Sequence, residues 1–374
     1  MPRGLHKSSL RARSAVLWSL ACFLVFQIGF SSITERWLPE MRDPEYGFKF
    51  AALRRRMAEV HSRPLVLILG SSRSGMGLSP TAMRRADAAC ADSRLVFNFS
   101  MTGCGPVFEL TTLRRLLAQG VHPDRLIVEV MPALLNQEPY WTEIQWMHIT
   151  RCGWNDVNII KRYTPVVLPW EEWIEATALP FYGHRFAIMS RFASYWLPWE
   201  VRQDGWKTMD EWGWLPPIHK VINPQVCSKA LESERKNYQP VLFRYRISPG
   251  PDGALRELLA LCRREKIGVM LLVMPEGRIF RSWYPAGAQA MADAYVAGLG
   301  EEYHVPVVNA RTSMPDSAFL DSHHLLPAAA AEFSARFSRE VLEPFCRGKQ
   351  LAVLSSAVDT AGEQVPVHKP SRNP

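Results

Sequence analysis

The sequence predicts an α/β protein with a parallel sheet, preceded by one membrane-spanning helix. Two observations predict the sheet: apolar runs without polar alternation, and a repeated order of strand, glycine-bearing turn and helix. The spanning helix is predicted by residues 14–34, which carry no charge. With 374 residues, 47% of them hydrophobic, the chain is long enough for one large domain with an insertion.

Residues 14–34 are predicted to anchor the protein in the inner (cytoplasmic) membrane, because about 20 apolar residues in a helix cross a hydrocarbon core. Residues 1–13 are basic, whereas Glu35, Glu40 and Asp43 follow the apolar stretch. We therefore expect a cytoplasmic stub and a periplasmic or extracellular body. A cleaved signal peptide is the alternative, but the apolar region is long and no good Ala-x-Ala site follows it.

The formal net charge of +8 does not point to nucleic acid, because membrane topology explains the basic residues of the stub. Six of the seven cysteines follow the anchor, where an oxidising compartment permits disulfides. Free buried thiols fit the sequence equally well, and the spacing of the cysteines does not choose a pairing. No cysteine or histidine spacing indicates zinc, and we expect no metal.

A lead-in of residues 35–64, with a helix around 48–57, precedes a domain at residues 65–346. Strands are predicted at residues 65–69, 95–99, 125–130, 267–274 and 305–309. Helices are predicted at residues 79–86, 107–118, 253–265, 286–303 and 328–342. The polar tail at residues 347–374 is expected to be disordered.

Residues 136–240 interrupt this order and hold ten of the thirteen tryptophans. We interpret them as an insertion that is helical and partly irregular. Its aromatic rings have three possible uses, and the sequence does not separate them. They fill the core of the insertion, stack against sugar rings, or contact the membrane or a membrane partner.

A glycine and two serines end the first strand, at Gly70, Ser71 and Ser72. The spacing from Gly70 to Gly75 is that of a phosphate-binding loop. The residues after Gly75 are methionine and glycine, whereas such a loop needs lysine and a hydroxyl residue. A dinucleotide fingerprint fails as well, because its third glycine is absent. Nucleotide binding is therefore excluded.

Polar residues follow three predicted strands: Ser72, the turn at Gly103, and the pair Asp321 and His324. The carboxyl ends of parallel strands share one edge of a sheet, so these residues are expected to meet. Ser72 would be the nucleophile, His324 its base, and Asp321 the residue that orients the base. The N–H groups of Ser72 and Gly103 would stabilise the oxyanion.

Neighbouring residues offer alternatives to these assignments. A serine in this place also caps a helix, and Ser71 and Ser74 are the fallback nucleophiles. His323 is adjacent to His324, but the spacing from Asp321 favours His324 as the base. We expect His323 to face solvent.

Three segments resemble sequence blocks of the SGNH/GDSL hydrolase superfamily: Gly70-Ser-Ser72, Asn98-Phe-Ser-Met-Thr-Gly103 and Asp321-Ser-His-His324. The anchor and the insertion make the chain most similar to the membrane-associated branch that contains DltD and the alginate acetylation proteins AlgJ and AlgX. The resemblance implies a flavodoxin-like three-layer α/β/α sandwich and acyl-ester chemistry without a cofactor. In this branch it also implies acyl transfer onto cell-envelope polymers, beside a membrane-bound O-acyltransferase.

The third block of the superfamily differs here. Where the family has Gly-x-Asn, the third strand ends at Glu129 and the next asparagine is Asn136. Asn136 or Arg73 is therefore the candidate for the remaining oxyanion donor.

The sequence thus predicts a membrane-anchored extracytoplasmic acyltransferase that moves an acetyl group onto a surface polysaccharide through a Ser72 acyl-enzyme. A polysaccharide acetylesterase is one alternative, because water replaces the sugar hydroxyl in the second step. Another is a non-catalytic SGNH-like subunit that binds polymer or a membrane-bound acyltransferase. That alternative predicts that Ser72, His324 and Asp321 lie apart.

Overall fold

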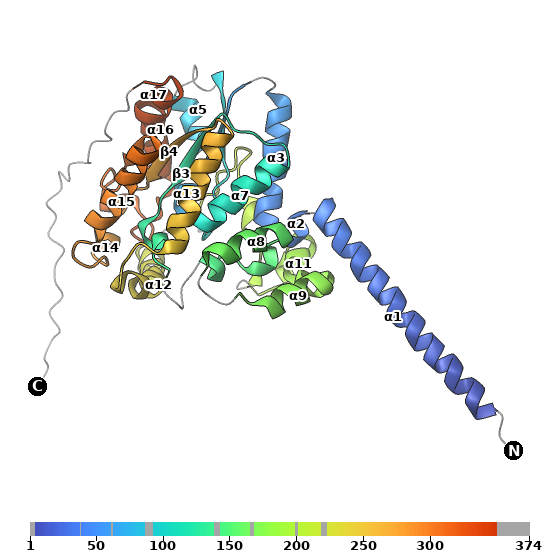
Figure 1. Cartoon of the computed structure of the whole chain (residues 1–374). Coiled ribbons are helices and arrows are strands. Elements are labelled where there is room, and N and C mark those ends of the chain that lie inside the picture. Colours follow the sequence, from blue (N-terminus) through green and yellow to red (C-terminus); the bar gives the residue numbers. More distant parts are fainter. Residues whose placement is uncertain are drawn as a thin grey trace, which may run out of the picture.

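The computed structural model describes residues 4–37, 39–60, 63–86, 93–137, 143–164, 168–198, 201–217 and 223–349. A long N-terminal helix leads into a body built around one sheet (Figure 1). The predicted tail lies outside the described residues from residue 350 onward, as do the first three residues of the predicted stub and parts of the insertion.

The sheet has five parallel strands in the order β2-β1-β3-β4-β5. The strands are β1 (Leu65–Leu69), β2 (Leu95–Asn98), β3 (Arg125–Glu129), β4 (Gly268–Val273) and β5 (Val307–Asn309). In the register, Ile68 of β1 lies opposite Asn98, and Leu69 lies opposite Val128. All five predicted strands are confirmed, and the order is that of the flavodoxin-like fold.

Helices cover both faces of the sheet. Leu67 and Leu126 face one layer, whereas their neighbours Ile68 and Ile127 face the other. The first layer comprises α3 (Pro44–Glu59), α7 (Pro106–Ala118), α13 (Pro249–Arg264) and α15 (Ala288–Tyr303). The second comprises α5 (Pro80–Ala86), α16 (Pro327–Phe337) and the π-helical turn η8 (Ser338–Leu342). This double cover explains why the strand sequences do not alternate, and the predicted three-layer α/β/α sandwich is confirmed.

Helix α1 (Gly4–Arg36) is continuous, so most of the predicted stub belongs to the same helix as the predicted anchor. Its segment Arg11–Thr34 is long and apolar enough to cross a membrane, and the body buries almost none of it. The short helix α2 (Pro39–Arg42) connects α1 to α3.

The insertion consists of helices joined by irregular segments, as predicted. These are α8 (Trp154–Tyr163), α9 (Trp170–Ala178), α10 (Pro180–Gly183), α11 (Arg185–Ala193) and α12 (Pro224–Phe243). Between them and elsewhere lie the 3₁₀ turns η1 (Pro132–Leu135), η2 (Glu143–Gln145), η3 (Ile149–Arg151), η4 (Ser194–Trp196), η6 (Gly205–Thr208) and η7 (Asp316–Ala318).

The aromatic rings of the insertion divide between its core and its surface. Trp173 and Trp212 are buried, which agrees with a core-filling use. Trp154 and Trp196 are largely exposed, so core filling does not account for all of the rings. Two of the ten tryptophans, Trp141 and Trp199, lie outside the described residues.

A buried carboxylate joins the lead-in to the sheet layers and to the insertion. Asp43 caps α3 and ion-pairs with Arg115 of α7, at 3.0 Å, and with Arg151 of the insertion, at 2.6 Å. Burial opposes its charge, but the two arginines hold the pKa of Asp43 below its usual value. Among the cysteines that the structure describes, all six are free thiols, and Cys90 lies outside the described residues.

Candidate active site

The first strand ends in a tight turn that presents Ser72. Ser72 is the first residue of the short helix α4 (Ser72–Gly77), and Ser71 is its N-cap. The Ser71 hydroxyl accepts a hydrogen bond from the N–H of Arg73 at 3.1 Å. Ser71 and Arg73 are buried, whereas Ser72 is half-buried. The turn therefore leaves Ser72 accessible at the carboxyl edge of the sheet.

Three residues from opposite ends of the chain meet at this edge. The Ser72 Oγ atom lies 2.8 Å from His324 Nε2, and His324 Nδ1 lies 2.7 Å from Asp321 Oδ2. The other carboxylate oxygen of Asp321 accepts hydrogen bonds from the backbone N–H groups of His323, at 3.2 Å, and His324, at 2.8 Å. The structure thus places Ser72, His324 and Asp321 in the order that a nucleophile, a base and an orienting acid require.

The electrostatics of this group favour proton uptake by His324. Burial opposes charge on Asp321, but the adjacent His324 and His323 rings hold its pKa well below the usual value. Burial also opposes charge on His324, yet the Asp321 carboxylate raises the pKa of His324 above 6.5. A proton that leaves Ser72 would therefore be held on a ring that Asp321 stabilises.

The candidate oxyanion donors lie on adjoining turns. The N–H of Met101 donates to the carbonyl of Gly70 at 2.9 Å, which joins the turn after β2 to the turn after β1. Ser72 begins α4, so its N–H has no carbonyl to bond within that helix. In the described part of the chain, no residue accepts a hydrogen bond from the N–H of Gly103. Gly103 has a φ of +73°, and a side chain there would collide with Trp146.

Asn136 and Arg73, the two candidates for the third oxyanion donor, both donate hydrogen bonds to other groups in the structure. The side-chain amide of Asn136 donates to the carbonyl of Val241 in α12 at 2.6 Å. The Arg73 guanidinium is fully buried and donates to the carbonyls of Met274, at 2.9 Å, and Pro275, at 3.0 Å. Neither side chain hydrogen-bonds to Ser72, and the other candidate oxyanion donors are the backbone N–H groups of Ser72 and Gly103.

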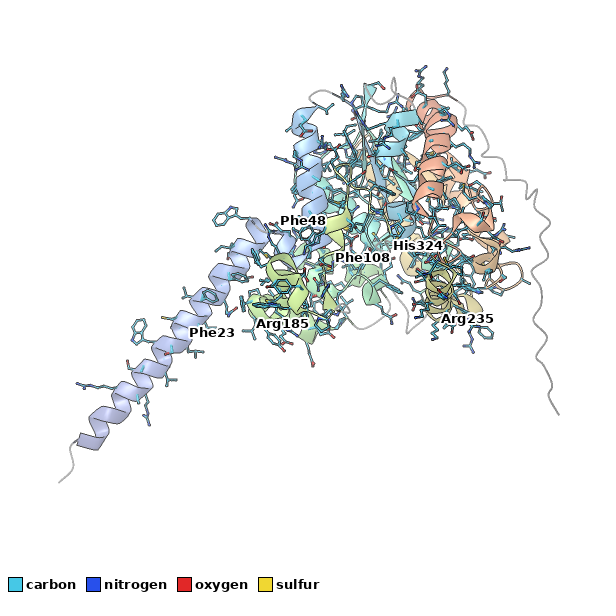
Figure 2. The ribbon with its side chains drawn as sticks, turned by 180° about the vertical axis from the view of Figure 1, so that it is seen from behind. Phe23, Phe48, Phe108, Arg185, Arg235 and His324 are labelled. Carbon is cyan, nitrogen blue, oxygen red and sulfur yellow. The ribbon has the colours of Figure 1, made fainter. Side chains whose placement is uncertain are left out.

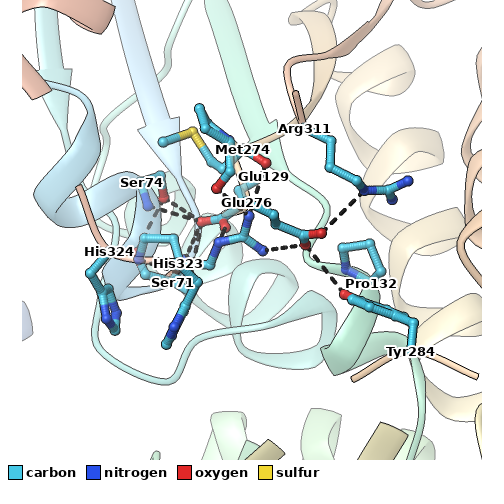
Figure 3. A network of polar contacts seen from close by, with 12 residues as sticks. Ser71, Ser74, Glu129, Pro132, Met274, Glu276, Tyr284, Arg311, His323 and His324 are labelled. Carbon is cyan, nitrogen blue, oxygen red and sulfur yellow. Dashed lines mark hydrogen bonds and ion pairs between the residues drawn. The ribbon is translucent and has the colours of Figure 1, made fainter. Parts of the chain in front are cut away.

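A carboxylate that the sequence analysis did not assign lies beneath the serine turn. Glu129 Oε2 accepts hydrogen bonds from the N–H groups of Ser71, at 2.9 Å, and Ser74, at 3.2 Å. It also accepts from the hydroxyls of Ser71, at 3.0 Å, and Ser74, at 2.6 Å (Figure 3). Gly70 permits this approach, because a Cβ there would lie 2.6 Å from the same oxygen. An acidic residue ending an apolar strand was the signal available in the sequence.

A chain of buried ion pairs extends from the serine turn to the ends of β4 and β5. Arg73 Nη1 lies 3.1 Å from Glu276 Oε1, and Glu276 Oε2 lies 3.2 Å from Arg311 Nε. Tyr284 donates to Glu276 at 3.2 Å (Figure 3). Arg311 continues the chain to Asp293, at 2.7 Å. Because several strand ends share these charges, the serine turn is fixed relative to the whole edge.

Ser71 and Ser74 donate to Glu129, so their hydroxyls are committed to holding the turn. The expectation that His323 faces solvent is wrong. Its side chain is buried, with the ring stacked on Phe280 at a centroid distance of 4.7 Å and an interplanar angle of 27°. The reason is that α14 (Arg278–Arg281) and Tyr238 of α12 cover this side of the turn.

Asp321, His323 and His324 also offer ligand atoms that lie within 4.8 Å of one another, a spacing that a metal ion requires. The atoms of Asp321 and His324 make the hydrogen bonds described above. A metal ion held there would therefore compete with the connection to Ser72, and we assign the residues to that connection.

The fold and the site together define an α/β sandwich with a Ser-His-Asp arrangement at the carboxyl edge of its sheet. A family model described as "Protein of unknown function (DUF1574)" matches residues 49–144, which include Ser72 and Gly103. A comparison with curated proteins gave no match.

Two solved structures illustrate what the chain is similar to. One is a GDSL-like lipase from Bacteroides thetaiotaomicron, with 9% identity, coverage of 79% of this chain and 98% of that chain, and a TM-score of 0.34. The other is a catalytic mutant of an acetylxylan esterase from Geobacillus stearothermophilus, with 14% identity, coverage of 74% and 93%, and a TM-score of 0.32.

Proposed function

We propose that the protein is a membrane-anchored serine enzyme that transfers an acyl group, acetyl in the first instance, to hydroxyls of a cell-surface polysaccharide. The observation that carries this proposal is the hydrogen-bonded order Ser72, His324, Asp321, with distances of 2.8 and 2.7 Å. The resemblance of the sequence blocks to the membrane-associated SGNH branch supports the choice of transfer and of a polymer acceptor.

The arrangement supports a two-step reaction. Ser72 Oγ attacks the carbonyl carbon of the donor ester while its proton moves to His324 Nε2. The N–H groups of Ser72 and Gly103 hold the oxyanion, and His324 then protonates the departing alkoxide. In the second step an acceptor hydroxyl attacks the Ser72 ester, gives its proton to His324, and the acyl–Oγ bond breaks as Ser72 recovers that proton.

A cavity beside the Gly103 turn supports a saccharide acceptor. It has a volume of about 340 Å³, which lies within the range of small-molecule sites. Thr102 and Trp146 border it at the turn, and His148, Arg202 and Trp206 also line it. Aromatic rings and hydrogen-bond donors suit the faces and hydroxyls of sugar rings. We infer that this cavity holds the acceptor.

The proposed location rests on α1. We infer that α1 spans the inner membrane with its basic end in the cytoplasm, so that the sheet and the insertion lie on the outer side. A membrane-bound O-acyltransferase would supply the acyl group there. The non-catalytic alternative predicted that Ser72, His324 and Asp321 lie apart, which the distances between their side chains do not support.

The test uses the full-length chain in detergent with p-nitrophenyl acetate. We expect intact-mass spectra to show one added acetyl group in the wild type and none in Ser72→Ala. Ser93→Ala is the matched control, because Ser93 is exposed before β2 at the opposite edge of the sheet. An adduct that persists in Ser72→Ala would contradict the assignment of the nucleophile.

Transfer and hydrolysis are then separated by adding surface oligosaccharides to the acetylated protein. Acetyl recovered on sugar supports the transferase. Acetyl recovered only as acetate, whatever saccharide is present, supports the acetylesterase, which shares the same first step.

A further inference from the structure

Helices α9 to α11 and the turn η4 expose large apolar side chains in a way that folding of the body does not explain. Six of them are between 51% and 71% exposed: Ile174, Phe181, Tyr182, Phe192, Tyr195 and Trp196. Single exposed apolar residues are common on protein surfaces. Six within three consecutive short helices and the turn η4 that follows them form a concentration typical of an interaction site. We call this group the aromatic face.

The aromatic face adjoins the outer end of the membrane-spanning segment. Helix α1 contacts α9 and α10, and the Phe30 ring meets the Phe181 ring edge-on at a centroid distance of 6.0 Å. Figure 1 shows α9 and α11 beside the end of α1, and Figure 2 shows Arg185 there from behind. Phe30 precedes the end of the segment, Thr34, by one helical turn. Phe181 therefore lies beside the apolar segment, about one helical turn before the segment ends.

Polar contacts fix this position. Arg191 of α11 ion-pairs with Glu40 of α2 at 2.8 Å. Lys207 donates to the carbonyl of Ser190 at 3.1 Å and to the hydroxyl of Ser194 at 2.9 Å, which holds the end of α11. The ion pair therefore ties α11 to α2, the short helix that follows α1.

The chemistry of the face suits a lipid interface. Tyrosine and tryptophan collect where acyl chains meet headgroups. An arginine accompanies the rings: the guanidinium of Arg185 lies over Tyr182 at 4.0 Å and over Phe186 at 4.5 Å. A cation beside exposed rings matches the phosphate groups above acyl chains.

From this position and chemistry, we propose that the aromatic face is immersed in the outer phospholipid interface next to α1. This inference rests on the proposed spanning role of α1. The protein then has two membrane contacts, a spanning helix and an interfacial surface, rather than a body tethered by a single helix. Two contacts fix the tilt of the body, so the serine edge stands at a constant height above the bilayer.

The test places the photo-crosslinker p-benzoylphenylalanine at one position of the full chain in vesicles of phosphatidylethanolamine and phosphatidylglycerol. The positions are Phe192 on the aromatic face, Leu24 within α1, and Met291 on α15. Met291 is the matched control, because it is 48% exposed and α15 lies across the body from α1 (Figure 1). After irradiation, mass spectrometry is expected to find lipid adducts at positions 192 and 24 and none at 291.

The three positions separate the possible failures. Adducts at 24 without adducts at 192 would overturn the interfacial contact and leave the anchor standing. Absence of adducts at 24 would refute the spanning role of α1, and the interfacial contact with it. A cross-link from 192 to a second copy of the chain in place of lipid would show a protein interface and overturn the proposal.

Discussion

The Nδ1 atom of His324 lies 2.7 Å from Oδ2 of Asp321, with the carboxylate held by two backbone N–H groups. This hydrogen bond places the proton of a neutral ring on Nδ1, which leaves Nε2 free to accept from Ser72. The same contact sets the pH at which the proposed base works, and it leads to the first prediction.

Asp321→Asn is expected to lower kcat by roughly 10⁴-fold, the usual effect of losing the orienting acid of such a triad. Only the neutral His324 ring accepts a proton, so activity falls as the pH drops through its pKa. Asp321 raises that pKa against the effect of burial. In the wild type, the fall of kcat/KM on the acid side therefore lies above pH 6.5. In Asp321→Asn the same fall moves to lower pH. A kcat/KM profile in which this fall does not move would contradict this account.

The two adjacent histidines are expected to respond differently to replacement by phenylalanine. His324→Phe removes the base and should lower kcat by at least about 10³-fold. His323→Phe keeps an aromatic ring against Phe280, and Asp321 stays held by backbone N–H groups. We expect its kcat within about tenfold of the wild type. Equal losses in the two variants would show that the rings share the role.

Two glycines with left-handed backbones test the oxyanion turn. Gly103 and Gly120 have φ angles of +73° and +78°, so alanine at either costs about 1–2 kcal/mol of stability. A Cβ at Gly120 meets nothing within 4 Å, whereas one at Gly103 collides with Trp146. Gly103→Ala should therefore lose more stability and about 10²–10³-fold in kcat. Gly120→Ala should keep its activity. Matched denaturation curves and kinetics separate backbone strain, which both variants share, from displacement of the Gly103 N–H by the collision with Trp146.

The strands and the order of their polar ends were predictable because buried parallel strands have a simple pattern. The run Leu65–Leu69 is apolar throughout and stops at Gly70, so both the strand and its functional end are visible in the sequence. Asp321 and His324 were predictable because a spacing of three residues lets both side chains point the same way. Such signals depend only on local sequence.

Residues whose role depends on distant partners were not predictable. The sequence shows Glu129 as an acid at the end of an apolar strand, but its role appears only when the fold brings Ser71 and Ser74 onto its carboxylate. His323 was expected in solvent because nothing near it in the sequence indicates that α12 and α14 cover it. Asn136 was assigned by its residue type alone, whereas its position gives its amide to Val241.

Glu129→Gln tests whether the carboxylate positions the serine turn. The change removes a buried charge that lies 3.7 Å from Arg73. It also replaces one carboxylate oxygen with an NH₂ group, whose N–H bonds repel the N–H and O–H donors of Ser71 and Ser74. We expect a loss of about 3–5 kcal/mol in stability. In the fraction that folds, kcat should fall while KM stays constant, because Glu129 does not touch substrate. Glu232→Gln on α12, where the glutamate pairs with Arg235, is the control and should change neither. An altered KM with an unchanged kcat would refute the positioning role.

Lys49 provides a test of how the insertion is held to the sheet. Its Nζ atom is buried and donates to the carbonyls of Asn98, at 3.1 Å, and Gly213, at 2.6 Å. Burial lowers the pKa of Lys49 from 10.5 to about 8, although Glu45 and Asp210 oppose this shift. Between these two pH values the unfolded chain binds more protons than the folded one, so raising the pH stabilises the fold.

The expected gain from Lys49 across this interval is about 3 kcal/mol. Lys49→Met lacks the titrating group, so its stability should not share that rise. The measurement is urea unfolding of both proteins from pH 8 to pH 10.5, with the difference between their unfolding free energies plotted against pH. This difference cancels the contributions of all other groups that titrate in the same way in both proteins. A difference that stays constant over the interval would mean that Lys49 keeps its ordinary pKa, and that the contact between β2 and the insertion admits water.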